Sequence, residues 1–133
     1  MDDLRLKIVT PNKVFFDDII ERLVARSISG DFAILKNHTP YVTVLEIRDI
    51  KIRQNGKYRK AAIAGGYLSV KDNQVTIMTD ACEWADEIDL ERAKDLKARA
   101  EAYLKNPKSQ DDTLKAEIAL KKAINRINIH DEK

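Results

Sequence analysis

Leu68-Ser69-Val70-Lys71-Asp72-Asn73-Gln74-Val75-Thr76-Ile77 is the stretch that decides the fold of the first part of the chain. Apolar side chains alternate with polar ones on both sides of Asp72-Asn73, as they do in strands that bury one face. Asp and Asn tolerate the left-handed backbone of a tight turn. Residues 68–77 therefore predict a β-hairpin.

The same pattern recurs toward the N-terminus. Residues 4–8 alternate apolar and charged side chains and run into the turn-forming residues 10–12, Thr-Pro-Asn. Residues 50–53 alternate Ile with Lys and Arg before Asn55-Gly56, the strongest short signal for a hairpin. No helix-length periodic run separates these turns. The pattern predicts an antiparallel β-sandwich or barrel.

Composition changes near residue 85. All four glycines and seven of the eight aromatic residues precede this point, and Tyr103 alone follows it. The later residues are mostly Ala, Leu, Lys, Glu and Asp, which suit helices. We therefore expect a β-sandwich docking domain over residues 1–85 and a helical regulatory element over residues 86–133.

Residues 88–104 carry apolar side chains at helical spacing, with Asp86 and Asp89 placed as acidic caps. The breaker 106–110 follows, and Asp111 or Asp112 is expected to cap a second helix. One side of that helix is predicted to carry Ala116, Ala119, Leu120, Ala123, Ile124 and Ile127. The pattern indicates an αα-hairpin. Because Ala-rich faces bury little apolar area, the hairpin is expected to dock, undock or change partner.

Bulk composition excludes several classes. The 133 residues are 44% hydrophobic and 35% charged, with a net charge of only +2. Such a chain is a soluble globular protein without a strong bias toward nucleic acid or anionic membranes. No apolar run is long enough to span a bilayer, the N-terminus lacks the features of a signal peptide, and Cys82 is alone. We expect a reducing, cytoplasm-like compartment and no membrane insertion.

Catalytic and metal-binding signatures are missing from the sequence. Neither phosphate-binding glycine motifs nor G-x-S-x-G occurs, and His38 and His130 have no neighbours at metal-ligand spacing. Gly65-Gly66 is expected to mark a bulge or a close approach of two backbones. The chain is predicted to be non-catalytic, with no metal and no required cofactor.

The helical part offers one charged constellation. Arg92 and Arg99 project from nearly the same side of the first helix, and Lys122 and Arg126 form an i,i+4 pair on the second. With Lys115, these groups are placed to cradle an anion, while Glu83 and Asp89 are placed to accept hydrogen bonds from it. An ordinary solvated basic face is the alternative that spacing leaves open.

Four motifs in order resemble the epsilon subunit of bacterial F-type ATP synthase along essentially the whole chain. They are Lys7–Pro11, the segment Ser29–Pro40, Gly65–Val70 with Asn73–Ile77, and the Ile-Asp-x-x-Arg-Ala signature at Ile88–Ala93. Within the second motif, Ala33 replaces a glycine and Lys36-Asn37 replaces Pro-Gly. Asn37 tolerates the left-handed backbone that a glycine would have held.

The resemblance implies a β-sandwich of about ten strands followed by a two-helix hairpin. It also implies a central-stalk rotor subunit at the cytoplasmic face of the bacterial membrane, which helps couple proton or sodium flow to ATP synthesis. The sandwich would dock on the gamma subunit and the c-ring. The mobile hairpin would permit ATP hydrolysis when folded against the sandwich and inhibit it when extended along gamma into the catalytic hexamer, where it would meet beta and alpha subunits.

The resemblance also implies two sets of site residues. A regulatory ATP site maps onto Glu83, Ile88, Asp89, Arg92, Ala93, Arg99, Lys122 and Arg126. A contact with the beta subunit maps onto Lys115, Lys121, Lys122 and Arg126. Lys122 stands where ATP-binding relatives have arginine, so it keeps the charge but lacks the bidentate fork. A stand-alone ATP sensor is the main alternative function, and a nucleic-acid binder based on the basic second helix is the weakest.

Overall fold

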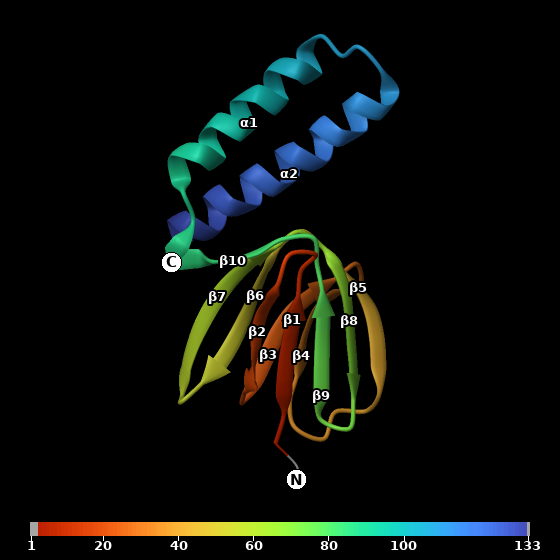
Figure 1. Cartoon of the computed structure of the whole chain (residues 1–133), viewed down its shortest axis with the longest axis vertical. Coiled ribbons are helices and arrows are strands. Elements are labelled where there is room, and N and C mark those ends of the chain that lie inside the picture. Colours follow the sequence, from red (N-terminus) through yellow and green to blue (C-terminus); the bar gives the residue numbers. More distant parts are fainter. Residues whose placement is uncertain (1–2, 133) are drawn as a thin grey trace. The chain divides into compact units, whose positions relative to one another are not determined.

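The computed structural model describes residues 3–132, and the chain divides into two units, one ending at Trp84 and one beginning at Ala85 (Figure 1). The described residues of the first unit form ten strands. They are β1 (Arg5–Val9), β2 (Val14–Ile19), β3 (Arg22–Ser27), β4 (Gly30–Ile34), β5 (Tyr41–Leu45), β6 (Asp49–Gln54), β7 (Lys57–Ile63), β8 (Gly66–Lys71), β9 (Gln74–Met78) and β10 (Cys82–Trp84).

The strands form the two layers of a sandwich. One layer follows the order β10-β7-β6-β3, with β4 also paired to β3, and the other follows β5-β8-β9-β1-β2. The layers join at one corner, where β3 pairs with β5 only through Ser27 and Leu45. Alternate residues of both layers point inward and form the core, in which Leu6, Leu23 and Ile77 are fully buried. This confirms the predicted β-sandwich.

One strand pair differs from the antiparallel prediction. Strand β1 pairs with β9 in parallel, from Arg5 opposite Gln74 to Val9 opposite Met78, whereas all other pairs among the described strands are antiparallel. Period-2 alternation specifies which face of a strand is buried but not the direction in which the strand runs. The alternating pattern of residues 4–8 was therefore consistent with either direction.

The predicted hairpins are confirmed by their turns. Asp72 and Asn73 have φ of 51° and 62°, and Asn55 and Gly56 have φ of 51° and 73°, as two-residue hairpin loops with primed turns require. Asn37, which was expected to take a left-handed backbone, has φ of 66°. These residue types reach this region at low steric cost.

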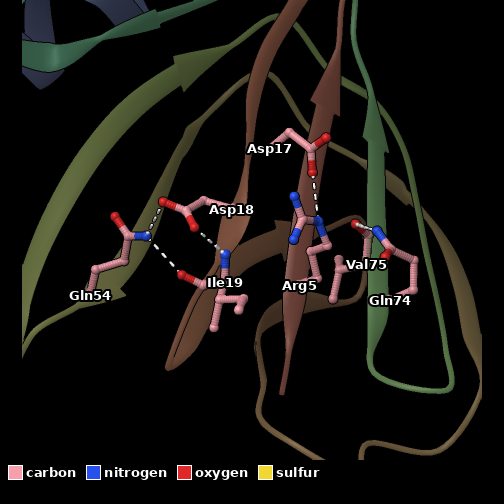
Figure 2. Close-up of polar contacts among 7 residues, drawn as sticks. All are labelled: Arg5, Asp17, Asp18, Ile19, Gln54, Gln74 and Val75. Carbon is pink, nitrogen blue, oxygen red and sulfur yellow. Dashed lines mark hydrogen bonds and ion pairs between the residues drawn. The ribbon is translucent and has the colours of Figure 1, made fainter. Parts of the chain in front are cut away.

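Side-chain bonds tie β2 to its surroundings (Figure 2). Arg5 Nε in β1 donates to Asp17 Oδ1 at 2.8 Å. Gln54 Nε2, at the end of β6, donates to the carbonyl oxygen of Ile19 at 2.7 Å and to Asp18 Oδ2 at 3.3 Å. Since β6 and β2 belong to different layers, Gln54 links the edges of the two layers.

The second unit contains a short 3-10 helix η1 (Ala85–Glu87) and the antiparallel helices α1 (Leu90–Lys105) and α2 (Gln110–Glu132) (Figure 1). The two helices pack along each other and form the predicted hairpin. Asp89 is the N-cap of α1, and its Oδ1 accepts a hydrogen bond from the backbone N–H of Arg92 at 3.1 Å, as predicted. Ala93, Ala100 and Ala123 are buried.

The predicted cap of α2 was wrong. Ser109 precedes the helix, and its Oγ accepts a hydrogen bond from the backbone N–H of Asp112 at 3.1 Å. Asp111 and Asp112 lie inside the first turn, where their charges suit the helix dipole without capping. Acidic residues are equally typical of the N-cap and of the first helical turn, so Asp111 and Asp112 do not by themselves show where α2 begins. The start of the helix is set by Ser109.

The predicted apolar side of α2 is only partly correct. Ala123 is fully buried, but Ala119 and Ile124 are exposed, while Asn125 and Ile129 are buried. Asn125 lies two positions from Ala123, about 200° around a helix. Helix α2 therefore has a second buried side, which the single-stripe interpretation missed.

Candidate docking face and hairpin site

A row of apolar side chains, three of them exposed and Val9 half-buried, crosses the outer face of β5, β8, β9 and β1. Val44 lies opposite Tyr67, Tyr67 lies opposite Met78, and Met78 lies opposite Val9 in the strand register. Val44, Tyr67 and Met78 are 46%, 62% and 60% exposed. Large apolar residues that adjoin one another on a surface mark interaction sites, whereas single ones do not. We refer to Val9, Val44, Tyr67 and Met78 as the apolar row.

An open pocket of about 520 Å³ adjoins the apolar row. Its lining consists of Val9, Thr10, Pro11, Val44, Ala64, Gly66, Tyr67, Met78, Thr79 and Asp80. Thr79 uses its hydroxyl within the fold, since Oγ1 accepts from the backbone N–H of Ala64 and donates to the carbonyl oxygen of Ala81, both at 3.2 Å. The pocket therefore offers mainly apolar contact to a partner.

Gly66 allows β8 and β9 to approach closely at this row. Its φ is +118°, and a Cβ built there would overlap the carbonyl oxygen of Met78. The prediction of a close backbone approach at Gly65-Gly66 is confirmed. The glycine thereby sets Tyr67 and Met78 side by side on the outer face.

The residues of the predicted ATP site are distributed over both units. Glu83 lies on β10 of the first unit, and the other seven lie in the second. Ile88 and Ala93 are buried, and the Asp89 side chain is engaged as the cap of α1.

The basic residues of the predicted ATP site lie at different positions along the hairpin. Because α1 and α2 are antiparallel, Arg92 in the first turn of α1 and Arg126 near the end of α2 lie at the same end of the hairpin. Arg99 lies about 10 Å further along α1, and its Nε pairs with Asp95 Oδ2 at 3.0 Å. Lys122 is half-buried.

The residues of the predicted beta-subunit contact all lie on α2. Lys115 and Lys121 are exposed, whereas Lys122 and Arg126 are half-buried. Exposed apolar residues Leu114, Ile118 and Ile124 lie on the same helix. A partner of α2 would therefore meet both basic and apolar side chains.

One titratable group of the first unit is strongly perturbed. Burial raises the pKa of the Cys82 thiol to about 12, the nearby Glu83 carboxylate adds to the increase, and Lys13 opposes it. The thiol is therefore protonated at neutral pH and is a poor nucleophile. Within residues 3–132, no three His, Cys, Asp or Glu side chains gather in a way that would hold a metal ion. No helix in this part of the chain has both the length and the hydropathy to cross a membrane.

Sequence reasoning missed the apolar row. The signal was present in residues 41–45, Tyr-Val-Thr-Val-Leu, where apolar side chains occupy both odd-numbered and even-numbered positions of the strand. Such a strand places apolar residues on the solvent face as well as on the core face. The pairing of β5 with β8 was needed to show that Val44 adjoins Tyr67.

Together, these features define a small two-part protein, a β-sandwich with an exposed apolar face that is followed by a helical hairpin. Family models match both parts of it. The ATP synthase delta/epsilon chain β-sandwich domain matches residues 3–85, and the delta/epsilon chain long α-helix domain matches residues 86–130. The chain belongs to the ATP synthase delta/epsilon family, which confirms the resemblance found in the sequence.

Bacterial relatives carry the name ATP synthase epsilon chain. The protein of Desulforamulus reducens is 46% identical over 123 residues, which cover 92% of this chain and 93% of the relative. That of Ruminococcus albus is 45% identical over 130 residues and covers 97% of each chain.

Solved structures share the fold at lower identity. A chain of the Euglena gracilis mitochondrial ATP synthase OSCP/F1/c-ring structure aligns with a TM-score of 0.79 at 22% identity, over 94% of this chain and 79% of that one. A chain of the Tetrahymena thermophila central stalk and c-ring structure aligns with a TM-score of 0.59 at 20% identity, over 96% and 93%.

Proposed function

We propose that the chain is a non-catalytic rotor subunit in the central stalk of an F-type ATP synthase, where it helps couple proton or sodium translocation to ATP synthesis. The complex would hold it peripherally at the cytoplasmic face of a bacterial membrane. The observation that carries the proposal is the apolar row, an exposed docking face on a chain of the delta/epsilon family. The assemblies that contain similar folds, an F1/c-ring complex and a central stalk with its c-ring, support the same role.

The apolar row is assigned to the gamma subunit, and the sandwich as a whole is expected also to contact the c-ring. Replacing Tyr67 with aspartate puts a charge at the centre of the row without touching the core, because the side chain is 62% exposed. Ile28→Asp is the matched control, since Ile28 is 75% exposed but lies outside the row. The measurement is the affinity of each variant for ATP synthase from which this subunit has been removed.

We expect Tyr67→Asp to bind at least tenfold more weakly, because a charge would be desolvated at an apolar interface. Ile28→Asp should bind as the natural chain does. Equal affinity of the two variants would remove the apolar row from the interface.

The hairpin is proposed to act as a brake on ATP hydrolysis. Its helices meet through small side chains such as Ala93, Ala100 and Ala123, which bury little apolar area each. Separation of the helices from their folded position therefore costs little, and exposed Leu114 and Ile118 are available to a new partner. In the extended state the hairpin would run along gamma into the catalytic hexamer, with Lys115, Lys121, Lys122 and Arg126 facing an acidic segment of beta.

Deletion of the chain from residue 87 onward tests the brake. The sandwich is a separate unit that ends at Trp84, so assembly into the synthase should persist. The rate of ATP hydrolysis should rise when the inhibitory element is absent. A truncated chain that assembles and leaves hydrolysis unchanged would show that the hairpin is not a brake.

ATP is proposed to stabilise the folded hairpin through Arg92, Arg126 and the other residues of the predicted site. The shared location of Arg92 and Arg126 at one end of the hairpin supports this. Calorimetry of the whole chain should show saturable binding that Arg92→Ala abolishes. Lys94→Ala is the control, because it removes a charge about 200° away on the same helix.

Absence of heat with the natural chain would reject the ATP site and leave the rotor role standing. The alternative function, a stand-alone ATP sensor, predicts the opposite pair of results. It requires ATP binding together with a failure of the chain to associate with the depleted synthase.

A further inference from the structure

The turn between β6 and β7 contains Asn55-Gly56, the one Asn-Gly pair in the sequence. Both residues are exposed to water. An asparagine that precedes glycine is chemically labile, because glycine has no side chain to keep its backbone nitrogen away from the asparagine amide carbon. The turn that gives the hairpin its shape is therefore also a position at which the chain can be modified.

The modification is deamidation, and it needs only water. The Gly56 nitrogen loses its proton to a solvent base and forms a bond to Cγ of Asn55. The side-chain nitrogen of Asn55 takes up a proton and leaves as ammonia, so that a five-membered succinimide ring remains. Water then opens the ring at either carbonyl and leaves aspartate or isoaspartate at position 55. One water is consumed and one ammonia is released.

The backbone conformation of Asn55 opposes this ring closure. Its φ of 51° lies in the left-handed region, where ψ is about +47°. With that ψ, Cβ of Asn55 and the Gly56 nitrogen lie on nearly opposite sides of the Cα–C bond. The five-membered ring requires both atoms on the same side of that bond. Asn55 must therefore leave the turn conformation before Gly56 can attack.

Glu21, in the connection between β2 and β3, holds the nitrogen that would attack. Its Oε1 accepts a hydrogen bond from the backbone N–H of Gly56 at 2.8 Å. This charge-assisted bond must break before the peptide group between Asn55 and Gly56 can rotate. The negative charge of the carboxylate also disfavours removal of the proton that Gly56 has to lose. Glu21 therefore opposes both the rotation and the deprotonation.

Glu21 is itself fixed against the β6–β7 hairpin. Its backbone N–H donates to the carbonyl oxygen of Arg53 at 2.8 Å, and Arg53 Nε lies 3.7 Å from Glu21 Oε1. The Arg53 guanidinium lies over the ring of Tyr58, 5.7 Å from its centroid. These contacts keep the carboxylate of Glu21 beside the turn.

We propose that Asn55 is a deamidation site of this chain and that Glu21 protects it. The rate of deamidation is then set by how often the turn opens locally. Isoaspartate would add one carbon to the backbone of a two-residue turn, and aspartate would bring a second negative charge close to Glu21. The site lies outside the apolar row and the helical hairpin, so this inference does not depend on the docking or brake roles.

Incubation of the whole chain at mildly alkaline pH tests the proposal. Mass spectrometry follows the conversion of the Asn55 amide to a carboxylate, and protein isoaspartyl methyltransferase measures the isoaspartate that forms. Glu21→Ala should deamidate roughly three to ten times faster than the natural chain, because a charge-assisted hydrogen bond no longer holds the turn closed. Glu21→Gln keeps an acceptor oxygen without the charge and should also deamidate faster than the natural chain. The natural chain unfolded in denaturant should deamidate faster than the folded chain.

Glu46→Ala is the matched control, because it removes a carboxylate that also pairs with an arginine, Arg26 Nε at 3.2 Å, but that makes no bond to the turn. This variant should deamidate at the rate of the natural chain. Equal acceleration by Glu46→Ala would attribute the effect to a general loss of stability and overturn the role of Glu21. Deamidation of both Glu21 variants at the natural rate would overturn it as well. Equal rates in the folded and unfolded natural chain would show that the turn does not protect Asn55.

Discussion

Comparison of Gly66→Ala with Gly30→Ala separates two effects of replacing a glycine, the cost of an unfavourable backbone conformation and the steric conflict of the added Cβ. Gly66 has φ of +118°, and an added Cβ would meet the carbonyl oxygen of Met78. Gly30 has nearly the same φ, +119°, but an added Cβ would meet nothing within 4 Å. The pair Gly66→Ala and Gly30→Ala thus shares the backbone cost and differs in the steric conflict.

The magnitudes follow from these two terms. An L-residue in this part of conformational space costs about 1–3 kcal/mol, and both variants should lose that amount. At Gly66, β8 and β9 must also separate locally, which weakens one or two ladder hydrogen bonds of about 1 kcal/mol each. Gly66→Ala should therefore be less stable than Gly30→Ala by about 2 kcal/mol, a difference of about 8–16 °C in Tm for a unit of this size.

Tryptophan fluorescence provides the assay. Trp84 is the only tryptophan in the chain, and it packs on Phe15 and Phe16 with ring centroids 4.9 Å and 5.9 Å away. Its emission therefore reports unfolding of the sandwich rather than of the hairpin. Equal losses of stability in the two variants would refute the steric role of Gly66.

Three further predictions concern single side chains. Ser109→Ala should lower the stability of the helical hairpin by about 1 kcal/mol in denaturation followed by far-UV circular dichroism, while Ser109→Asp, which can still accept from Asp112, should not. Tyr103→Phe removes the acceptor of the Lys108 backbone N–H, which bonds to Tyr103 Oη at 3.1 Å; amide exchange at Lys108 should accelerate with helix content unchanged, and unchanged exchange would contradict the bond. The raised pKa of Cys82, about 12 against 9.0 for an ordinary thiol, leaves roughly a thousandth of the usual thiolate at pH 8. Alkylation of Cys82 by iodoacetamide should therefore be slower in the folded chain than in the unfolded chain by about that factor. The protonated thiol should favour the folded state fully below pH 9, and the folded state should lose this contribution to its stability as pH rises toward 12. Equal alkylation rates in folded and unfolded chains would reject the pKa shift.

Local signals in the sequence predicted most of the local structure. Asn55-Gly56 and Asp72-Asn73 identified two hairpins because few other residue pairs accept positive φ. Asp89 was found as a cap because it precedes the first apolar position of α1. Each of these depends on residues within a few positions of one another.

Features that depend on distant pairing were not predicted. The parallel β1–β9 pair and the apolar row both arise from which strands become neighbours, and alternation alone does not determine this. Asn125 was missed because a helix with two buried sides has no single stripe. The proposed ATP and beta-subunit residues came from the family resemblance, and their roles stay predictions.

The position of β1 in the sheet determines the order in which strands can pair while the chain is being synthesised. Strand β1 leaves the ribosome first, yet its parallel partner β9 follows about 70 residues later. Until then, β1 can form its hairpin with β2 but cannot be enclosed in the sheet, and Leu6 and Ile8 remain without their final neighbours. The helical hairpin, whose contacts are local, is synthesised only after the last strand of the sandwich. Leu6 and Ile8 of the growing chain therefore stay accessible to water until β9 has been synthesised.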